Sequence, residues 1–341
     1  MPDISFVIPF RNEEAFLAQT LRSLEQQELG GISAEILLLD GASTDSSREI
    51  IGPFLARSTD RLRMRLLDNP LRTTPFAFNI GVAESRSDVV GFGGAHTNYP
   101  PTYLRRAVEL LHESEADVVG GGHDQFVTSD TGVLAIAMTC LYQSPMGAGV
   151  AAYHRRTEPG FVDTVYGGFY RRSVLERVGG FNERLTRNQD NELNARVRAA
   201  GFKIFFHPDL STSYVQKTDL PTFLKRGMIF GRYHPVTWRT TPRSFRMRHV
   251  VPLLFFTYLV SMGVLGILGR LSWWLFIPAA TYLALLLLSA LRLRRRVGLR
   301  SALLTIPVFF LFHTFYGFGT LVGLGSILRM DVPTRRMRNT A

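Results

Sequence analysis

The first half of the chain alternates between short apolar runs and longer segments whose apolar residues recur at helical spacing. Short apolar runs of this kind are typical of buried parallel strands. We predict strands at Ile4–Pro9, Glu35–Asp40, Arg63–Leu67, Asp88–Phe92 and Asp117–Gly121. The helical segments between them are 13–28, one that starts near Ser46, 75–85 and 101–114. This alternation predicts a doubly wound α/β sheet.

The chain is less regular beyond the fifth predicted strand. Residues 130–170 are rich in Gly, Ala and Tyr and show no clear period. Residues 171–200 have a helical pattern on both sides of a Gly-Gly break at 179–180, and Ile204–Phe206 is a further strand candidate. We therefore expect the α/β domain to extend over residues 1–216.

Two polar clusters directly follow the first two predicted strands. One runs from Pro9 to Glu13 and the other from Asp40 to Asp45. Each cluster alone can be explained as a strand end, a turn and a helix cap. Ligands of doubly wound sheets, however, bind outside the carboxyl ends of the strands. We therefore expect the chemistry in the loops after Pro9, Asp40 and Phe92, where the clusters offer carboxylates to a nucleobase and a ribose.

The last third of the chain contains three long apolar stretches. Val250–Gly269 and Leu271–Leu291 carry no charge, and each has the roughly 20 residues needed to span a bilayer. We predict that they form a hairpin of two membrane spans. Ser301–Leu328 is also long enough, but Pro307 and several glycines interrupt its pattern. Both a third crossing and a broken or re-entrant segment fit this stretch.

Basic residues beside these stretches predict their orientation. Arginines at 292–300 follow the second stretch, and such residues favour the cytoplasmic side of a membrane. The N-terminal region carries charge from Asp3 onward and shows no signal peptide. We expect a protein of the cell inner (cytoplasmic) membrane whose N-terminal domain faces the cytoplasm. A third crossing would instead place the basic tail, 329–341, outside.

Charge is distributed unevenly along the chain. Residues 217–341 contain 18 of the 39 Lys and Arg residues but only two of the 28 Asp and Glu residues. An acidic body joined to a basic, apolar tail indicates contact with membrane lipids rather than with nucleic acid. Residues 217–249 mix basic with aromatic residues, which predicts an amphipathic interfacial segment; a solvated basic linker is the alternative. The predicted organisation is 1–216 as the α/β domain, 217–249 as the interfacial segment, 250–328 as the membrane anchor and 329–341 as a basic tail.

Six stretches, in this order and spacing, resemble family 2 glycosyltransferases, and in particular the membrane-associated, exopolysaccharide-building branch of the succinoglycan glucosyltransferase type. They are PFRNEE (9–14), LLLDGASTDSS (37–47), NPLRTTPFAFNIGVAES (69–85), GAHTNYPPTYL (94–104), VDTVYGGFYRRSVLERVGGFNE (162–183) and NQDNELNARVRAAGFKIFFHPD (188–209). The resemblance covers about residues 3–235. It implies a GT-A fold, which is Rossmann-like, and an inverting transfer of a sugar from a nucleotide-sugar donor.

The resemblance also implies roles for single residues. Pro9, Arg11 and Glu13 would line the nucleotide pocket, and Asp40 would accept a hydrogen bond from the base, with uracil as the expected base. The remaining donor-side residues that it implies are Asp45, Arg72, Asn79 and Gly168. Asp45 could equally be only a helix cap.

The general base implied by the resemblance is Asp190. An inverting transfer needs such a base to deprotonate the acceptor hydroxyl. Asp190 begins a predicted helix, so a capping role is the alternative. Glu192 is the second choice for the base.

The family's metal motif departs from its usual pattern here. In this branch it resembles Asp-Ala-His, whereas this chain has Gly94, Ala95 and His96. The resemblance implies a divalent cation, Mn²⁺ or Mg²⁺. His96 can ligate Mn²⁺ but suits Mg²⁺ poorly. Three interpretations are open: Mn²⁺ held by His96 and substrate oxygens, diphosphate binding by Arg or Lys without a metal, and reduced or absent activity.

The predicted function is transfer of a sugar from a UDP-sugar donor to a polyprenyl-diphosphate-linked glycan in bacterial polysaccharide synthesis. The Gln-x-x-Arg-Trp box of processive relatives is absent, which indicates addition of a single sugar. The alternative is a catalytically silent nucleotide-sugar-binding or assembly protein of the same membrane complex. Dinucleotide-binding and P-loop motifs are missing. Cys140 is the sole cysteine, so a disulfide within the chain and a Cys-rich metal site are excluded.

Overall fold

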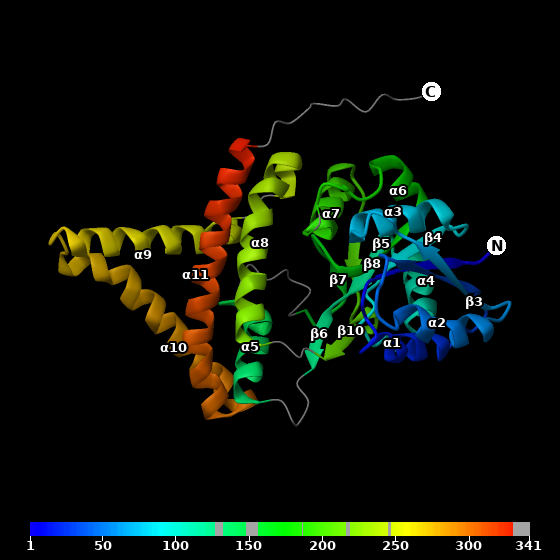
Figure 1. Ribbon diagram of the computed structural model, residues 1–341, viewed down its shortest axis with the longest axis horizontal. Coiled ribbons are helices and arrows are strands. Elements are labelled where there is room, and N and C mark those ends of the chain that lie inside the picture. Colours follow the sequence, from blue (N-terminus) through cyan, green and yellow to red (C-terminus); the bar gives the residue numbers. More distant parts are fainter. Residues whose placement is uncertain (127–131, 148–155, 186, 216–218, 245–246, 330–341) are drawn as a thin grey trace.

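The computed structural model describes residues 1–126, 132–147, 156–185, 187–215, 219–244 and 247–329. An α/β domain lies at one end of the molecule, and helices from the C-terminal third lie beside it and project away from it (Figure 1). One helix from the irregular middle of the chain, α5 (Val133–Gln143), joins the C-terminal helices instead of the α/β domain.

An eight-stranded mixed sheet forms the centre of the α/β domain. Its order is β3-β2-β1-β4-β8-β5-β9-β7. The strands are β1 (Ile4–Phe10), β2 (Ala34–Asp40), β3 (Leu62–Asp68), β4 (Val89–Phe92), β5 (Val118–Gly121), β7 (Gly160–Phe161), β8 (Tyr166–Arg171) and β9 (Ile204–Phe206). A smaller two-stranded sheet pairs β6 (His123–Phe126) with β10 (Thr212–Val215).

The first four strands of the chain lie in parallel, as predicted. β1 lies between β2 and β4 and is parallel to both. The order of the sheet therefore reverses between β1 and β4, which opens a crevice at their carboxyl ends. β8 is antiparallel to both β4 and β5, so the second half of the sheet is mixed, a feature that the irregular sequence of 130–170 did not reveal.

Helices cover both faces of the sheet. They are α1 (Leu17–Glu25), α2 (Ser47–Ala56), α3 (Thr74–Glu84), α4 (Tyr103–Glu113), α6 (Arg172–Val178) and α7 (Gln189–Ala199). Alternate residues of β1 enter different cores: Phe6 and Ile8 pack with α1, α2 and α4, whereas Val7 packs with α3, α6 and α7. A strand buried on both sides needs apolar residues at nearly every position, which explains the continuous apolar runs and confirms the doubly wound arrangement.

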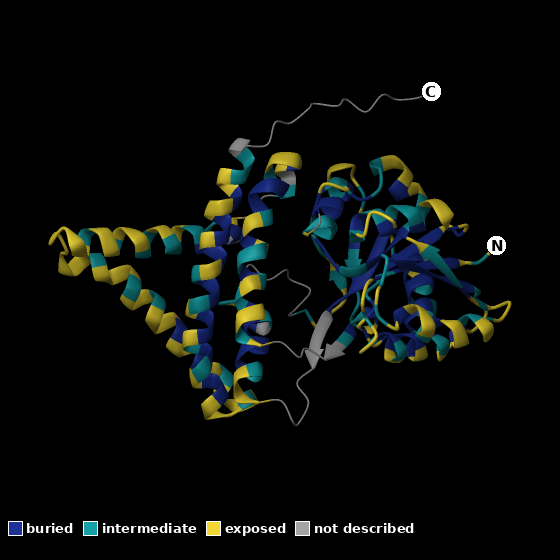
Figure 2. Ribbon diagram, in the orientation of Figure 1, coloured by how far each residue is buried: buried dark blue, intermediate teal, exposed yellow. Residues whose placement is uncertain are grey.

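The helices of the C-terminal third form a second body. They are α8 (Leu220–Thr240), α9 (Val251–Ile267), α10 (Ile277–Val297) and α11 (Leu299–Arg329). α5, α8 and α11 share a core that includes Leu141, Phe223 and Phe312. α9 and α10 project away from the α/β domain and meet at a distant tip (Figure 1). Their surfaces are largely exposed (Figure 2).

Of the two alternatives left open for the third apolar stretch, the structure excludes the broken segment. The stretch after residue 300 is a single 31-residue helix, α11, and is not broken. Its glycines serve close packing instead: a Cβ added at Gly319 would lie 2.0 Å from the carbonyl oxygen of Met228, and one at Gly323 would lie 2.3 Å from that of Arg232. The glycines therefore bring the backbone of α11 against α8, as small residues do at tightly packed helix pairs.

By length and hydropathy, two helices among the described residues could cross a membrane, and one of them belongs to the predicted pair. Trp273–Val297, which overlaps the second predicted span, and Leu299–Ile327 meet both criteria, while α9 has 17 residues, at the lower limit for a span. Half of the α11 window is buried inside the protein, against 17% of the α10 window. Hydropathy therefore favours α10 and α11 as the membrane-crossing pair. Packing does not, because much of α11 is buried against the rest of the protein.

Candidate active site

A cleft of about 420 Å³ opens at the carboxyl ends of β1 and β4, where the order of the sheet reverses. Seven of the ten predicted site residues line it: Pro9, Arg11, Glu13, Arg72, His96, Gly168 and Asp190. They come from segments up to 181 positions apart in the chain. The resemblance therefore selected residues that the fold brings to one place.

Asp40 lies beside the cleft but does not line it. Its side chain is fully buried. One carboxylate oxygen accepts from the Ser43 N–H at 2.9 Å, and the other accepts from Arg48 Nη1 at 2.7 Å. Two donors already hold this carboxylate, and Gly41 is the neighbouring residue that lines the cleft. In this structure Asp40 thus fixes the turn after β2.

Asp45 also lies outside the cleft lining. Its carboxylate accepts from the N–H of Ser47 at 3.0 Å and from the N–H of Glu14 at 3.1 Å. These contacts stabilise the start of α2 and connect it to the loop after β1. The capping alternative that the sequence left open for Asp45 matches these contacts.

Asn79 does not line the cleft, but it binds a residue that does. Its carboxamide accepts from the Phe181 N–H at 2.8 Å and donates to the Phe181 carbonyl at 2.9 Å. It also donates to Glu183 Oε1 at 2.9 Å. Phe181 lines the cleft, so Asn79 holds one wall of the cleft against α3 and does not itself face a donor.

Asp190 is the acidic residue that α7 presents to the cleft. It is half-buried there, and its Oδ1 accepts from the N–H of Asn191 at 2.9 Å. The N-cap position of α7 belongs to Asn188, not to Asp190. Burial raises the pKa of the Asp190 carboxyl above its usual value. A carboxylate with a raised pKa is a stronger base, which suits proton abstraction.

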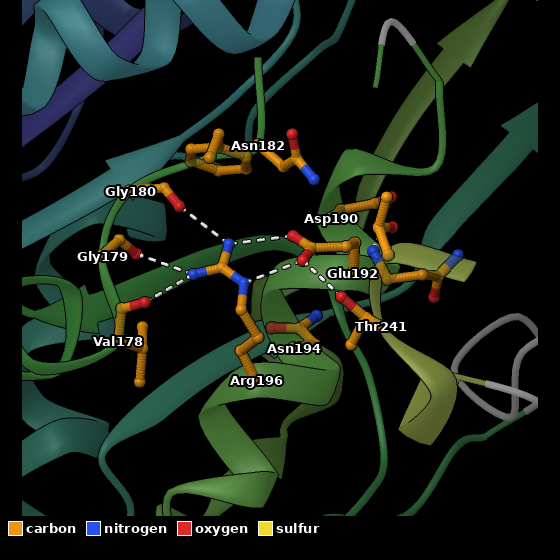
Figure 3. Close-up of polar contacts among 12 residues, drawn as sticks. Val178, Gly179, Gly180, Asn182, Asp190, Glu192, Asn194, Arg196 and Thr241 are labelled. Atoms are coloured by element: carbon orange, nitrogen blue, oxygen red, sulfur yellow. Dashed lines mark hydrogen bonds and ion pairs between the residues drawn. The ribbon is translucent and has the colours of Figure 1, made fainter. Parts of the chain in front are cut away.

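Glu192, two residues further on, lies in a different environment. It is 2% exposed and does not line the cleft. Arg196 binds its carboxylate with two nitrogens, at 2.9 and 2.8 Å, and the Thr241 hydroxyl donates to it at 2.7 Å. Figure 3 shows Arg196 between Glu192 and the carbonyl groups of the loop after α6. The structure therefore favours Asp190 over Glu192 as the group that meets a substrate.

The imidazole of the metal motif lies beside a carboxylate from the loop after β1. His96 Nδ1 lies 3.4 Å from Glu13 Oε1, and both residues line the cleft. Gly94 lines it as well but has no side chain to offer. Within the described ranges, no three His, Cys, Asp or Glu residues group together as a metal site. One nitrogen and one oxygen, completed by substrate oxygens, fit Mn²⁺ better than Mg²⁺.

The cleft contains charges that the sequence reasoning missed. Arg187, three positions before Asp190 in the chain, lines it together with Arg11 and Arg72. The described lining thus includes these three arginines, which suit an anionic diphosphate. Arg72 has a left-handed backbone, with φ at 60°, a conformation that costs a non-glycine residue on the order of 1 kcal/mol. Arg187 stands directly before the NQD motif, a signal that could have found it.

Comparison with known proteins identifies the family of this chain. Residues 5–179, just over half of the chain, match the glycosyl transferase family 2. The chain belongs to this family. It is therefore a glycosyltransferase, as the resemblance predicted.

Two curated relatives match nearly the whole enzyme. The dolichyl N-acetyl-alpha-D-glucosaminyl phosphate 3-beta-D-2,3-diacetamido-2,3-dideoxy-beta-D-glucuronosyltransferase of Methanococcus voltae is 26% identical over 94% of this chain and 97% of its own length. The succinoglycan biosynthesis protein ExoA of Rhizobium meliloti (strain 1021) is also 26% identical, over 82% of each chain. By their names, these relatives act in lipid-linked glycan and polysaccharide synthesis.

A solved structure supports the fold assignment. The mannosyltransferase PcManGT from Pyrobaculum calidifontis, in complex with GDP-Man and Mn²⁺, superposes with a TM-score of 0.60 at 18% identity. The superposition covers 90% of this glycosyltransferase and 86% of that chain. The predicted GT-A fold is thereby confirmed, together with two apolar C-terminal helices long enough to span a membrane.

Proposed function

We propose that this glycosyltransferase transfers a single sugar, with inversion, from a UDP-sugar to a glycan linked to a polyprenyl diphosphate in bacterial polysaccharide synthesis. The observation that carries the proposal is the position of Asp190. It shares one cleft with Arg11, Glu13 and Arg72, so a base and a diphosphate-binding region face the same space. The Methanococcus relative is named for a dolichyl phosphate-linked substrate, which supports a lipid-linked acceptor.

In the proposed reaction Asp190 accepts the proton of the acceptor hydroxyl. The hydroxyl oxygen then attacks the anomeric carbon from the side opposite the diphosphate, and the bond to the diphosphate oxygen breaks. A single displacement of this kind inverts the configuration. Negative charge develops on the departing diphosphate, and Arg11, Arg72 and Arg187 provide fixed positive charge to stabilise it.

The nucleoside would lie over the loops after β1 and β2. Pro9, Glu13 and Gly41 line the cleft there, and small or rigid residues permit a base to approach the backbone. We retain uracil as the proposed base. Asp40 would act by holding the turn that presents Gly41, because Ser43 and Arg48 already occupy its carboxylate.

A divalent cation would be held by Glu13 and His96. When bound, it would neutralise part of the diphosphate charge. The carboxylate of Glu13 would then replace the one missing at Gly94, and the three arginines would supply the remaining positive charge. The arginines also bind a diphosphate without a metal, so the two modes of binding share the same part of the cleft.

For the membrane, we propose that α9 and α10 insert as a hairpin into the inner membrane, with the catalytic domain in the cytoplasm. These helices project from the molecule on the side away from the α/β domain (Figure 1). The exposed residues of the two helices include Leu254, Val264, Leu287 and Leu291, and Trp273 and Trp274 are exposed in the turn that joins them. Exposed apolar faces of this extent are typical of contact with lipid. Helices α8 and α11 would then lie at the membrane surface.

A catalytically silent protein that binds nucleotide-sugars is the second candidate. It is favoured by Gly94, which removes the carboxylate that leads the family's metal motif. Such a protein would bind UDP tightly and produce no transfer.

The test is a screen of UDP-sugars with lipid-linked acceptors in the presence of Mn²⁺, with mass detection of the product. We expect transfer by the wild-type enzyme and loss of at least 100-fold in the Asp190→Asn variant, since a general base contributes about 10²–10⁴-fold. Asp60→Asn is the matched control, because Asp60 is exposed and lies outside the cleft. Equal, background turnover of wild type and Asp190→Asn on all donors, with tight UDP binding, would favour the silent protein.

A further inference from the structure

Helix α8 holds the residue that lies two positions before the proposed base. Asn188 has a left-handed backbone, with φ at 66°. Its side-chain nitrogen lies 3.1 Å from His234 Nδ1 and 3.4 Å from Thr237 Oγ1, both on α8. His234 and Thr237 are buried. The turn that leads into Asp190 is therefore attached to α8 through a side-chain carboxamide.

The residue two positions after the base is attached at the end of the same helix. The hydroxyl of Thr241, directly after α8, donates to Glu192 Oε1 at 2.7 Å. Both groups are buried, and a buried carboxylate that loses a donor bears the cost of its desolvation. The contact thus favours one fixed arrangement of the segment 188–192.

The network continues from Glu192 to the wall of the cleft. Arg196 connects Glu192 to the carbonyl oxygens of Val178, Gly179 and Gly180, at 2.6, 3.1 and 2.7 Å (Figure 3). The next residue, Phe181, lines the cleft. A displacement of α8 would therefore be transmitted both to the base and to the cleft wall.

The apolar helix α11 in turn fixes the position of α8. The two helices run side by side in the same direction (Figure 1). A Cβ at Gly231 would lie 2.0 Å from the Tyr316 carbonyl oxygen, and one at Gly319 would lie 2.0 Å from the Met228 carbonyl oxygen. Backbones packed this closely have little freedom to slide. The catalytic segment is thus connected through α8 to the apolar part of the molecule.

We infer that α8 is a positioning element for catalysis, in which Thr241 and His234 hold the segment 188–192 so that Asp190 faces the acceptor correctly. The inference rests on the proposed role of Asp190. Neither Thr241 nor His234 lines the cleft, so both act through the segment and not on the substrate. Small displacements of a base are costly, since about 1 Å of misplacement can reduce a rate about 100-fold.

Removal of the Thr241 hydroxyl tests this inference. Thr241→Val should lower kcat by about tenfold, as expected for a lost hydrogen bond to a buried charge, while the KM for the donor and the affinity for UDP stay within about twofold. Thr241→Ser should restore kcat because it keeps the hydroxyl. Thr240→Val is the matched control: the Thr240 hydroxyl bonds only to the α8 carbonyls of Val236 and Thr237 in the described contacts, and this variant should behave as wild type.

Hydrogen–deuterium exchange separates the inference from the proposed function, because it needs no turnover. A peptide covering 187–193 should exchange faster than in the wild type in Thr241→Val, and at the wild-type rate in Thr240→Val. His234→Leu removes the contact to Asn188 instead, and exchange of the same peptide should be accelerated in this variant as well. It keeps the inference testable if Thr241→Val does not fold. Wild-type exchange and kcat in Thr241→Val, or equal impairment in Thr240→Val, would overturn the inference. Absent turnover in the wild type would instead refute the proposed function, and exchange alone would then decide whether α8 orders the segment.

Discussion

Two acidic residues only two positions apart have opposite environments in this enzyme. Asp190 faces the cleft with a pKa raised by burial. Glu192 lies in the interior with a bidentate arginine and a hydroxyl donor. Their separation along α7 places them on different sides of the helix. A carboxylate therefore faces the cleft at one position and holds the fold at the other.

The raised pKa of Asp190 has a consequence for stability. A carboxyl whose pKa is higher in the folded than in the unfolded protein stabilises the fold when it is protonated, and this contribution is lost as the pH rises through the folded-state pKa. We therefore expect Asp190→Asn to be more stable than wild type at neutral pH and to lose this advantage on acidification. Thermal unfolding between about pH 4 and pH 8 measures it. Asp60→Asn should follow the wild-type curve, and a destabilised Asp190→Asn at neutral pH would contradict the prediction.

Restoration of the missing carboxylate tests the metal site. A Cβ at Gly94 would lie 3.2 Å from Thr97 Oγ1 and 3.4 Å from the Tyr166 hydroxyl, so a side chain needs only a small adjustment of its neighbours. We expect Gly94→Asp to tighten Mn²⁺ binding by roughly tenfold, since an added carboxylate contributes charge and an oxygen ligand. His96→Ala should weaken it.

Titration of Mn²⁺ in the presence of UDP, followed by electron paramagnetic resonance, measures both changes. Gly31→Asp makes the same change in charge where no atom lies within 4 Å of the added Cβ, and it should leave the affinity unaltered. Equal Mn²⁺ affinity in wild type, Gly94→Asp and His96→Ala would exclude this site.

At the scale of elements, glycine decides how the C-terminal helices pack. Gly227 and Gly231 of α8 face α11, and Gly319 and Gly323 of α11 face α8. Each pair has the four-residue spacing that places both glycines on one face of a helix. Glycine normally weakens a helix interior, and in this enzyme it permits the contact that connects α8 to α11.

Substitution at this contact should disturb the helix pair. Gly231→Ala would place its Cβ 2.0 Å from a backbone oxygen of α11, so α8 and α11 must separate. Overpacking of this kind costs about 1–3 kcal/mol, and we expect a lower melting temperature in detergent. Gly263→Ala is the control, because no atom lies within 4 Å of its added Cβ and alanine favours a helix. Equal melting temperatures for the two variants would argue against the close contact.

At the scale of the whole molecule, packing bears on the number of membrane crossings. The second half of α11 stays beside α8, from Phe312 at Gly227 to Ile327 at Arg239. α8 in turn contacts the catalytic segment at Asn188. A helix that follows α8 in this way remains on the side of the α/β domain, although its hydropathy alone would permit a crossing. We therefore expect one hairpin, α9 and α10, and no third span.

Labelling of single cysteines tests this topology. In a Cys140→Ser background, Arg336→Cys should react with a membrane-impermeant maleimide only from the side that labels Asp60→Cys, which marks the catalytic domain. Trp274→Cys, in the exposed turn between α9 and α10, should react only from the opposite side. Sealed vesicles of both orientations provide the measurement. Reaction of Arg336→Cys from the side opposite Asp60→Cys would show that α11 crosses.

The sequence by itself determined the α/β domain and much of the cleft. Strands buried on two faces require continuous apolar runs, and their carboxyl ends must meet at one edge, so Pro9, Arg11 and Glu13 could be placed from the pattern. The motifs that resemble the family, taken in their order, identified Asp190 and His96 as further candidate site residues. The glycines of Ser301–Leu328 left two alternatives open, since glycine weakens an isolated helix but permits close contact in a packed one.

Only the tertiary structure decided which polar residues face the cleft and which hold the fold. Asp40, Asp45 and Asn79 occur in the same motifs as the cleft residues, but donors distant in sequence, or on neighbouring turns, occupy their side chains. The connection of α8 to Asn188 and Glu192 joins segments about 50 positions apart. Local patterns record the period and burial of an element, whereas a hydrogen bond between elements depends on how the whole chain packs.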